Sequence, residues 1–66
     1  MEPNGMKTGY TTGVADDDIC LDCICDTEAE ARDVARRDGL KLYKVIWNGK
    51  DFDGMEVFLI DDFLWD

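Results

Sequence analysis

Three cysteines lie close together and are the first residues whose type and spacing could do chemistry. They form the pattern Cys20-x-x-Cys23-x-Cys25. A structural zinc site needs four ligands, usually Cys or His at paired spacings, and this chain has no His. A redox Cys-x-x-Cys typically places its first cysteine at a helix N-terminus, which stabilises the thiolate. Because the surrounding sequence is typical of a strand, we expect thiols in or near the core, and neither metal binding nor redox chemistry.

The predicted strand covers residues 16–26. Its odd positions from 19 to 25 are apolar or cysteine, and its even positions are mostly Asp. This period of two is typical of a half-buried strand with its acidic side outward. In such a strand Cys20 and Cys23 would point to opposite faces, and Cys23 and Cys25 would lie roughly 6.5–7 Å apart. We therefore expect no disulfide within the chain, while oxidation of an exposed Cys20 could link two chains.

A second pattern, Asp51-x-Asp53-Gly54-x-Glu56, is similar to part of a calcium-binding loop. Aligned on its glycine, an EF-hand loop would have glycine and isoleucine at the two ends where acidic residues are required. The flanking residues also favour strands rather than helices. We interpret the pattern as a turn.

Composition excludes most other catalytic chemistry. The chain has no His, Ser or Gln, which removes Ser-His-Asp, Cys-His and His-metal sites. Paired carboxylates need one group buried enough to raise its pKa, and 66 residues leave little volume for such a pocket. The glycines form no phosphate-binding motif. We expect a protein that is not an enzyme and holds no cofactor.

The net charge limits the kind of partner. Sixteen Asp and Glu against seven Lys and Arg give a net charge of −9, while 45% hydrophobic residues are enough to fold one small domain. Nucleic acids and anionic membranes repel so acidic a surface. No apolar segment resembles a signal peptide or a membrane anchor, so we expect a cytoplasmic protein. The predicted partner is a protein that attracts negative charge.

One helix is predicted at about residues 28–38. Thr27 and Glu30 fit a capping box, and Gly39 is a natural residue for the helix end. The pairs Glu28–Arg32 and Asp33–Arg37 have the spacing of ion pairs, each contributing about 0.2–0.5 kcal/mol. The apolar stripe consists of small residues, Ala31, Val34 and Ala35.

The rest of the chain is predicted to form strands. Residues 8–14 read as an edge strand interrupted by two glycines, and residues 1–7 as a frayed start. Residues 40–47 form a strand with Tyr43, Val45 and Trp47 on its core face. Turn signals at Asn48-Gly49 and Asp53-Gly54 precede a returning strand at 55–60, and residues 50–52 could be a short strand or part of a loop. We predict a single α+β domain over residues 1–66, with the helix packed on an antiparallel sheet of three or four strands.

The charges are unevenly distributed along the chain. Residues 16–33 hold eight acids and one base, 34–50 hold one acid and five bases, and 51–66 hold six acids and no base. The candidate partner-binding carboxylates are Asp16, Asp17, Asp18, Asp22, Asp26, Asp51, Asp53, Glu56, Asp61 and Asp62. Alternate carboxylates on the predicted 16–26 strand would stand about 6.6 Å apart, near the separation of phosphates along a nucleic acid. We expect them to occupy a groove lined with Lys and Arg that normally holds DNA; a solvated surface is the alternative.

Apolar residues opposite the core faces form a second candidate surface. Phe58, Ile60 and Trp65 are the possible contacts. If the sheet leaves them exposed, they would support a homodimer or anchor a partner, so the chain could be a monomer or a homodimer. The alternative is that the N-terminal segment covers them.

In size, acidity and layout, including the segments TEAEARDVARRDG and KLYKVIWNG, the chain resembles the small phage-encoded anti-CRISPR proteins. Several of these inhibit type I systems by presenting a DNA-like acidic surface to the Cascade effector, where target DNA would bind. The resemblance implies a non-catalytic DNA mimic in a phage-infected bacterium, with Cascade subunits as partners. These inhibitors share no motif, so the resemblance assigns no residue a role. A small phage or bacterial regulatory or structural protein is the alternative function.

Overall fold

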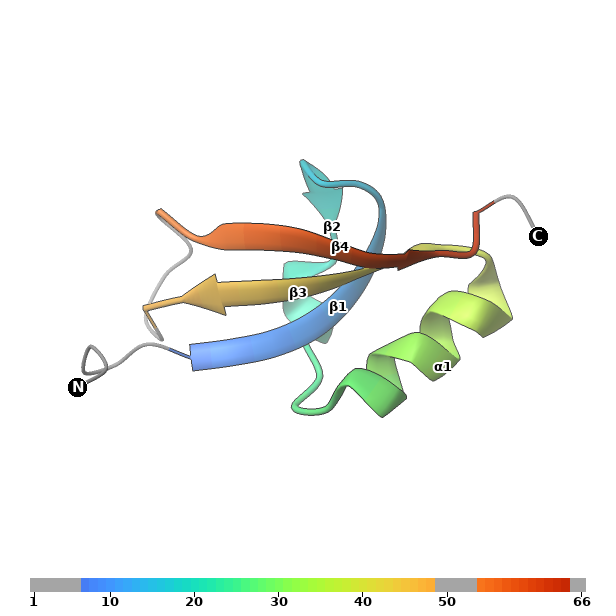
Figure 1. Ribbon diagram of the computed structural model, residues 1–66, viewed down its shortest axis with the longest axis horizontal. Coiled ribbons are helices and arrows are strands. Elements are labelled where there is room, and N and C mark those ends of the chain that lie inside the picture. The colour runs from blue at the N-terminus through green and yellow to red at the C-terminus, as the bar shows by residue number, and fades with distance from the viewer. Residues whose placement is uncertain (1–6, 49–53, 65–66) are drawn as a thin grey trace.

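The chain folds into a four-stranded antiparallel sheet with one α-helix across one face, which confirms the predicted α+β class (Figure 1). This computed structural model describes residues 7–48 and 54–64. The strand order is β2-β1-β3-β4. The elements are β1 (Lys7–Ala15), β2 (Asp18–Ile19), the 3₁₀ helix η1 (Leu21–Cys23), α1 (Glu28–Asp38), β3 (Lys41–Trp47) and β4 (Glu56–Asp62).

The helix begins and ends where its local signals predict. The hydroxyl oxygen of Thr27 accepts a hydrogen bond from the Glu30 N–H at 3.4 Å, which satisfies one of the free N–H groups of the first turn. At the other end, Gly39 has a φ of 68°, the left-handed conformation that glycine adopts without strain. The Glu28–Arg32 ion pair is present, whereas Arg37 pairs with Asp38 and not with Asp33 as predicted.

The core lies between the helix and the sheet. Ala31 and Ala35 of α1 pack on Leu42 of β3, and all three are buried. Their small side chains let the helix approach the sheet closely. The partly buried side chains around them are Tyr10, Cys25, Leu40, Ile60 and Phe63.

The other face of β3 is buried as well. Tyr43 and Val45 alternate with Leu42, so they lie on the face away from the helix, and both are buried as predicted. Trp47 is half-buried. A strand covered on both faces explains why the residues of β3 other than Lys41 and Lys44 are all apolar.

β1 is a central strand, so the prediction of an edge strand is wrong. It pairs with β3 from Lys7↔Trp47 to Gly13↔Lys41, and with β2 on its other side. The two glycines that suggested an edge instead permit close packing. A Cβ on Gly13 would lie 2.7 Å from the Ile19 Cα, and one on Gly9 would overlap the side chain of Ile24.

The prediction of one strand over residues 16–26 is also wrong. β2 has two residues, and the chain then forms η1 before Cys25 pairs with Tyr10. Four residues of β1, from Gly13 back to Tyr10, therefore face seven residues of the partner segment, from Ile19 to Cys25. The three-residue η1 takes up the excess.

β3 and β4 form the predicted hairpin, with pairs from Lys41↔Asp62 to Ile46↔Glu56. The predicted turn residues Gly49 and Asp53, and the choice between strand and loop for 50–52, lie outside the described residues. Gly54 adopts a φ of 76° just before β4. No helix within 7–48 and 54–64 has the length and apolar character needed to span a membrane.

Candidate binding surface

Most of the predicted partner-binding carboxylates are on the surface. Asp51 and Asp53 lie outside the described residues. The exposed ones are Asp16, Asp17, Asp18, Asp22, Asp26, Glu56 and Asp62. Only Asp61 of the described members is half-buried, and it has a structural role.

Asp16, Asp17 and Asp18 form an acidic turn where the chain passes from β1 to β2. The end of β4 lies one strand away from the end of β1 that leads into this turn, because Lys41 of β3 pairs with Gly13 on one side and with Asp62 on the other. The pKa of Tyr43 is raised first by burial and then by the nearby carboxylates of Asp16, Asp62 and Asp17. The fold thus gathers carboxylates from two distant parts of the chain around one tyrosine.

Although Lys41 lines the same surface hollow as Asp16, no carboxylate of the acidic turn forms an ion pair within the described part of the chain. The ion pairs found there use Arg32 and Arg37, and neither involves Asp16, Asp17, Asp18 or Asp62. Such carboxylates are hydrated and available to a basic partner, because binding need not break an existing pair.

The carboxylates do not form the regular row that the sequence suggested. Asp18 is in β2, Asp22 is in η1, and Asp26 lies in a bend before the helix. The 6.6 Å spacing of a continuous strand, about two residues of rise, therefore does not apply. Glu56 is at the far end of β4 from the acidic turn. Charge is gathered in separate groups, of which the acidic turn is the densest.

Asp61 of β4 forms an ion pair with Arg32 of α1 and so links the helix to the sheet. One Arg32 nitrogen donates to Asp61 at 2.8 Å and the other to Glu28 at 2.6 Å. The Asp62 N–H also donates to Asp61 at 2.9 Å. The pKa of Asp61 is lowered, first by the hydrogen bond from the Asp62 N–H and then by the one from Arg32. The pKa of Arg32 is raised, first by its hydrogen bond to Glu28 and then by the one to Asp61. Sequence reasoning could not find this pair, since its partners are 29 residues apart.

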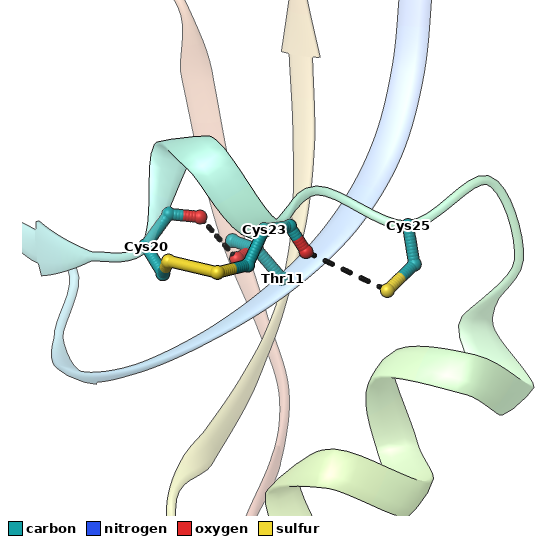
Figure 2. The surroundings of a disulfide bond; sticks show 4 residues. All are labelled: Thr11, Cys20, Cys23 and Cys25. Carbon is teal, nitrogen blue, oxygen red and sulfur yellow. Dashed lines mark hydrogen bonds between the residues drawn. A yellow bond between two sulfur atoms is a disulfide. The ribbon is translucent and has the colours of Figure 1, made fainter.

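Cys20 and Cys23 form a disulfide across η1, so the expectation of free thiols at these positions is wrong (Figure 2). The 3₁₀ turn brings the two Cα atoms to 5.4 Å, a normal disulfide separation that an extended strand could not reach. The Thr11 hydroxyl donates to the Cys20 carbonyl at 2.6 Å and attaches η1 to β1. The local signal that sequence reasoning missed is the Cys-x-x-Cys spacing itself, which suits a turn.

Cys25 keeps its thiol, which donates to the Cys23 carbonyl at 3.5 Å (Figure 2). The pKa of this thiol is raised, first by burial and then by the negative charges of Glu30 and Asp26. A thiol held in its protonated form is a weak nucleophile and a poor metal ligand. Within the described ranges, no three His, Cys, Asp or Glu side chains are placed to hold a metal ion.

The apolar surface differs from the predicted one. Phe58 is 48% exposed, as expected. Ile60 is half-buried and packs against the helix core, because the strand face that it shares with Phe58 is the face on which the helix lies. Trp65 lies outside the described residues. Leu59, on the strand face opposite to Phe58 and Ile60, is 55% exposed.

A shallow hollow of about 260 Å³ connects the acidic turn with the exposed part of β4. Its lining residues are Ala15, Asp16, Lys41, Tyr43, Val57 and Leu59. The surface available to a partner is therefore acidic at the turn and apolar along β4.

No protein family, curated protein or solved structure matches this chain.

Proposed function

We propose that this protein is a non-catalytic acidic inhibitor that binds the basic DNA-binding surface of a nucleic-acid-binding complex and so blocks target DNA. The observation that carries the proposal is the acidic turn, where Asp16, Asp17 and Asp18 are exposed and form no ion pair with a described residue. A surface built of Lys and Arg to hold phosphates attracts such a group.

Inhibition depends on the negative charge of the acidic turn and on the volume of the sheet behind it. Three consecutive carboxylates at the tip of a turn reach into a groove, while the sheet behind them prevents DNA from entering it. Opposite charges accelerate the encounter and orient the inhibitor on its partner. No bond is made or broken, and neither metal nor cofactor takes part.

The first partner to test is the type I Cascade effector, which the resemblance to anti-CRISPR proteins suggests. The protein would act in the cytoplasm of a phage-infected bacterium. It would contact Cascade protein subunits and neither nucleic acid nor membrane directly, because its net charge of −9 repels both.

The direct experiment is competition between this protein and a fluorescent target duplex for purified Cascade, at several salt concentrations. We expect the protein to displace the duplex and to lose affinity as salt rises, because the ion pairs are screened. Failure to compete for any Cascade subtype would refute Cascade as the partner. Binding that is insensitive to salt would refute the electrostatic mechanism.

A charge-matched pair of variants locates the contact. Asp16→Lys and Asp33→Lys change the net charge equally, but Asp33 is exposed on the helix, away from the acidic turn. We expect Asp16→Lys to weaken inhibition strongly and Asp33→Lys to weaken it slightly. Equal effects would mean that total charge, and not the turn, drives binding.

The exposed Phe58 favours a second candidate, a small regulatory or structural protein that acts through an apolar contact and pairs with a second copy. In that case Phe58→Asp would abolish assembly and Asp16→Lys would have no effect. Sedimentation at high protein concentration decides whether such an assembly forms.

A further inference from the structure

β4 is an open edge of the sheet. Within the described residues it pairs with β3 alone, so one side of its backbone has free N–H and C=O groups. Proteins often protect such edges with Lys or Pro, and the β4 sequence EVFLIDD contains neither. An edge of this kind is a template for another strand.

The middle of β4 is apolar on both sides. Phe58 and Leu59 are consecutive, so their side chains point to opposite faces of the sheet, and they are 48% and 55% exposed. A strand added to this edge would bring its own side chains against both of them. Backbone pairing and apolar contact would then act together.

The two ends of β4 are acidic. Glu56 begins the strand and Asp62 ends it, and both are exposed. Neither has an ion-pair partner within residues 7–48 and 54–64. A strand pairing along β4 would therefore meet negative charge at both of its ends, whichever way it runs.

This charge pattern disfavours a second copy of the chain as the occupant. A symmetric antiparallel pair of β4 strands centred on Leu59 would place Glu56 opposite Asp62 at both ends. Like charges directly opposite each other destabilise a sheet, and the two chains would each carry a charge of −9. The acidic ends thus protect the edge from self-association and leave it open to a basic segment.

We propose that β4 binds an extended segment of another protein as a fifth strand, and that this segment has an apolar centre and Lys or Arg at both ends. Opposite-charge pairs at the ends would set the register, and Phe58 and Leu59 would cover the centre. This proposal does not rest on the inhibitor function: the two share Asp62, but the backbone of β4, Phe58, Leu59 and Glu56 take no part in the acidic turn.

The test uses the full chain and a capped synthetic peptide as long as β4, with Lys at both ends and alternating Val and Thr between them. We expect saturable binding, with the largest amide chemical-shift changes in β4. The control peptides carry Glu in place of Lys, or Pro at the centre, and neither should bind. The absence of saturable binding up to about 1 mM Lys-ended peptide would overturn the proposal. Changes centred on the acidic turn would overturn it as well.

Matched variants make the test specific. Leu59→Asp should weaken the binding of the Lys-ended peptide by about tenfold or more. Val14→Asp, at a residue of β1 that is 45% exposed, should have little effect on this binding. Glu56→Lys should lower the preference for Lys ends over Glu ends, whereas Asp33→Lys, with the same change in net charge, should not. Equal effects within either pair would overturn the proposal, and shift mapping on the unmodified chain decides it if Leu59→Asp does not fold.

Discussion

Breaking the Cys20–Cys23 disulfide should lower the stability of the protein without unfolding it. The bond joins residues three positions apart, so it closes a loop of four residues. The entropy of closing such a loop in the unfolded chain corresponds to about 2 kcal/mol. A domain of this size has a free energy of unfolding of about 3–10 kcal/mol, so the loss is substantial but not complete.

Two hydrogen bonds should keep η1 in place after reduction. The Thr11 hydroxyl donates to the Cys20 carbonyl at 2.6 Å, and the Cys23 N–H donates to the same carbonyl at 3.3 Å. The reduced protein should therefore keep its fold, which matters because a reducing cytoplasm would hold the pair as two thiols.

Urea unfolding, followed by tryptophan fluorescence, measures the effect. With a slope of about 1 kcal/mol per molar urea, reduction should lower the midpoint by about 2 M. The double variant Cys20→Ser/Cys23→Ser should behave like the reduced protein, and Cys25→Ser like the oxidised one. Alkylation of the unfolded, unreduced chain should modify Cys25 alone. An unchanged midpoint, or alkylation of all three cysteines before reduction, would refute the reasoning.

Three further predictions concern the core, the contact between β1 and β2, and the ion pair between Arg32 of the helix and Asp61 of β4. Leu42→Ala should lower the free energy of unfolding by about 2–5 kcal/mol, because Leu42 is fully buried against α1; a loss below about 1 kcal/mol in urea unfolding would contradict its core position. Gly13→Ala should cost about 1–3 kcal/mol, because its Cβ would lie 2.7 Å from the Ile19 Cα; a neutral result would mean that β2 does not lie there. The folded state lowers the pKa of Asp61, so Asp61 stabilises the fold above its unfolded pKa and loses this effect as pH falls through its folded pKa. Asp61→Asn should therefore weaken the pH dependence of stability in the acid range, and an unchanged profile would exclude the contact with Arg32.

The sequence by itself determined the elements whose signals are local. The N-cap at Thr27 and the left-handed Gly39 are set by residues within a few positions, and the structure begins and ends the helix there. The β3–β4 hairpin likewise follows from two apolar strands joined by turn residues. The net charge and the absence of His are properties of composition and need no fold.

The tertiary structure alone decided which strand is central, where the acidic segment bends and which carboxylates meet. Alternation over residues 16–26 indicates a strand, but a continuous strand would place Asp22 opposite Tyr10, whereas η1 brings Cys25 to that position. That turn also joins Cys20 to Cys23. The approach of Asp62 and of the acidic turn to Tyr43, and the contact of Arg32 with Asp61, depend on the packing of distant segments. Such contacts follow from the order and pairing of strands, which no local pattern of residues specifies.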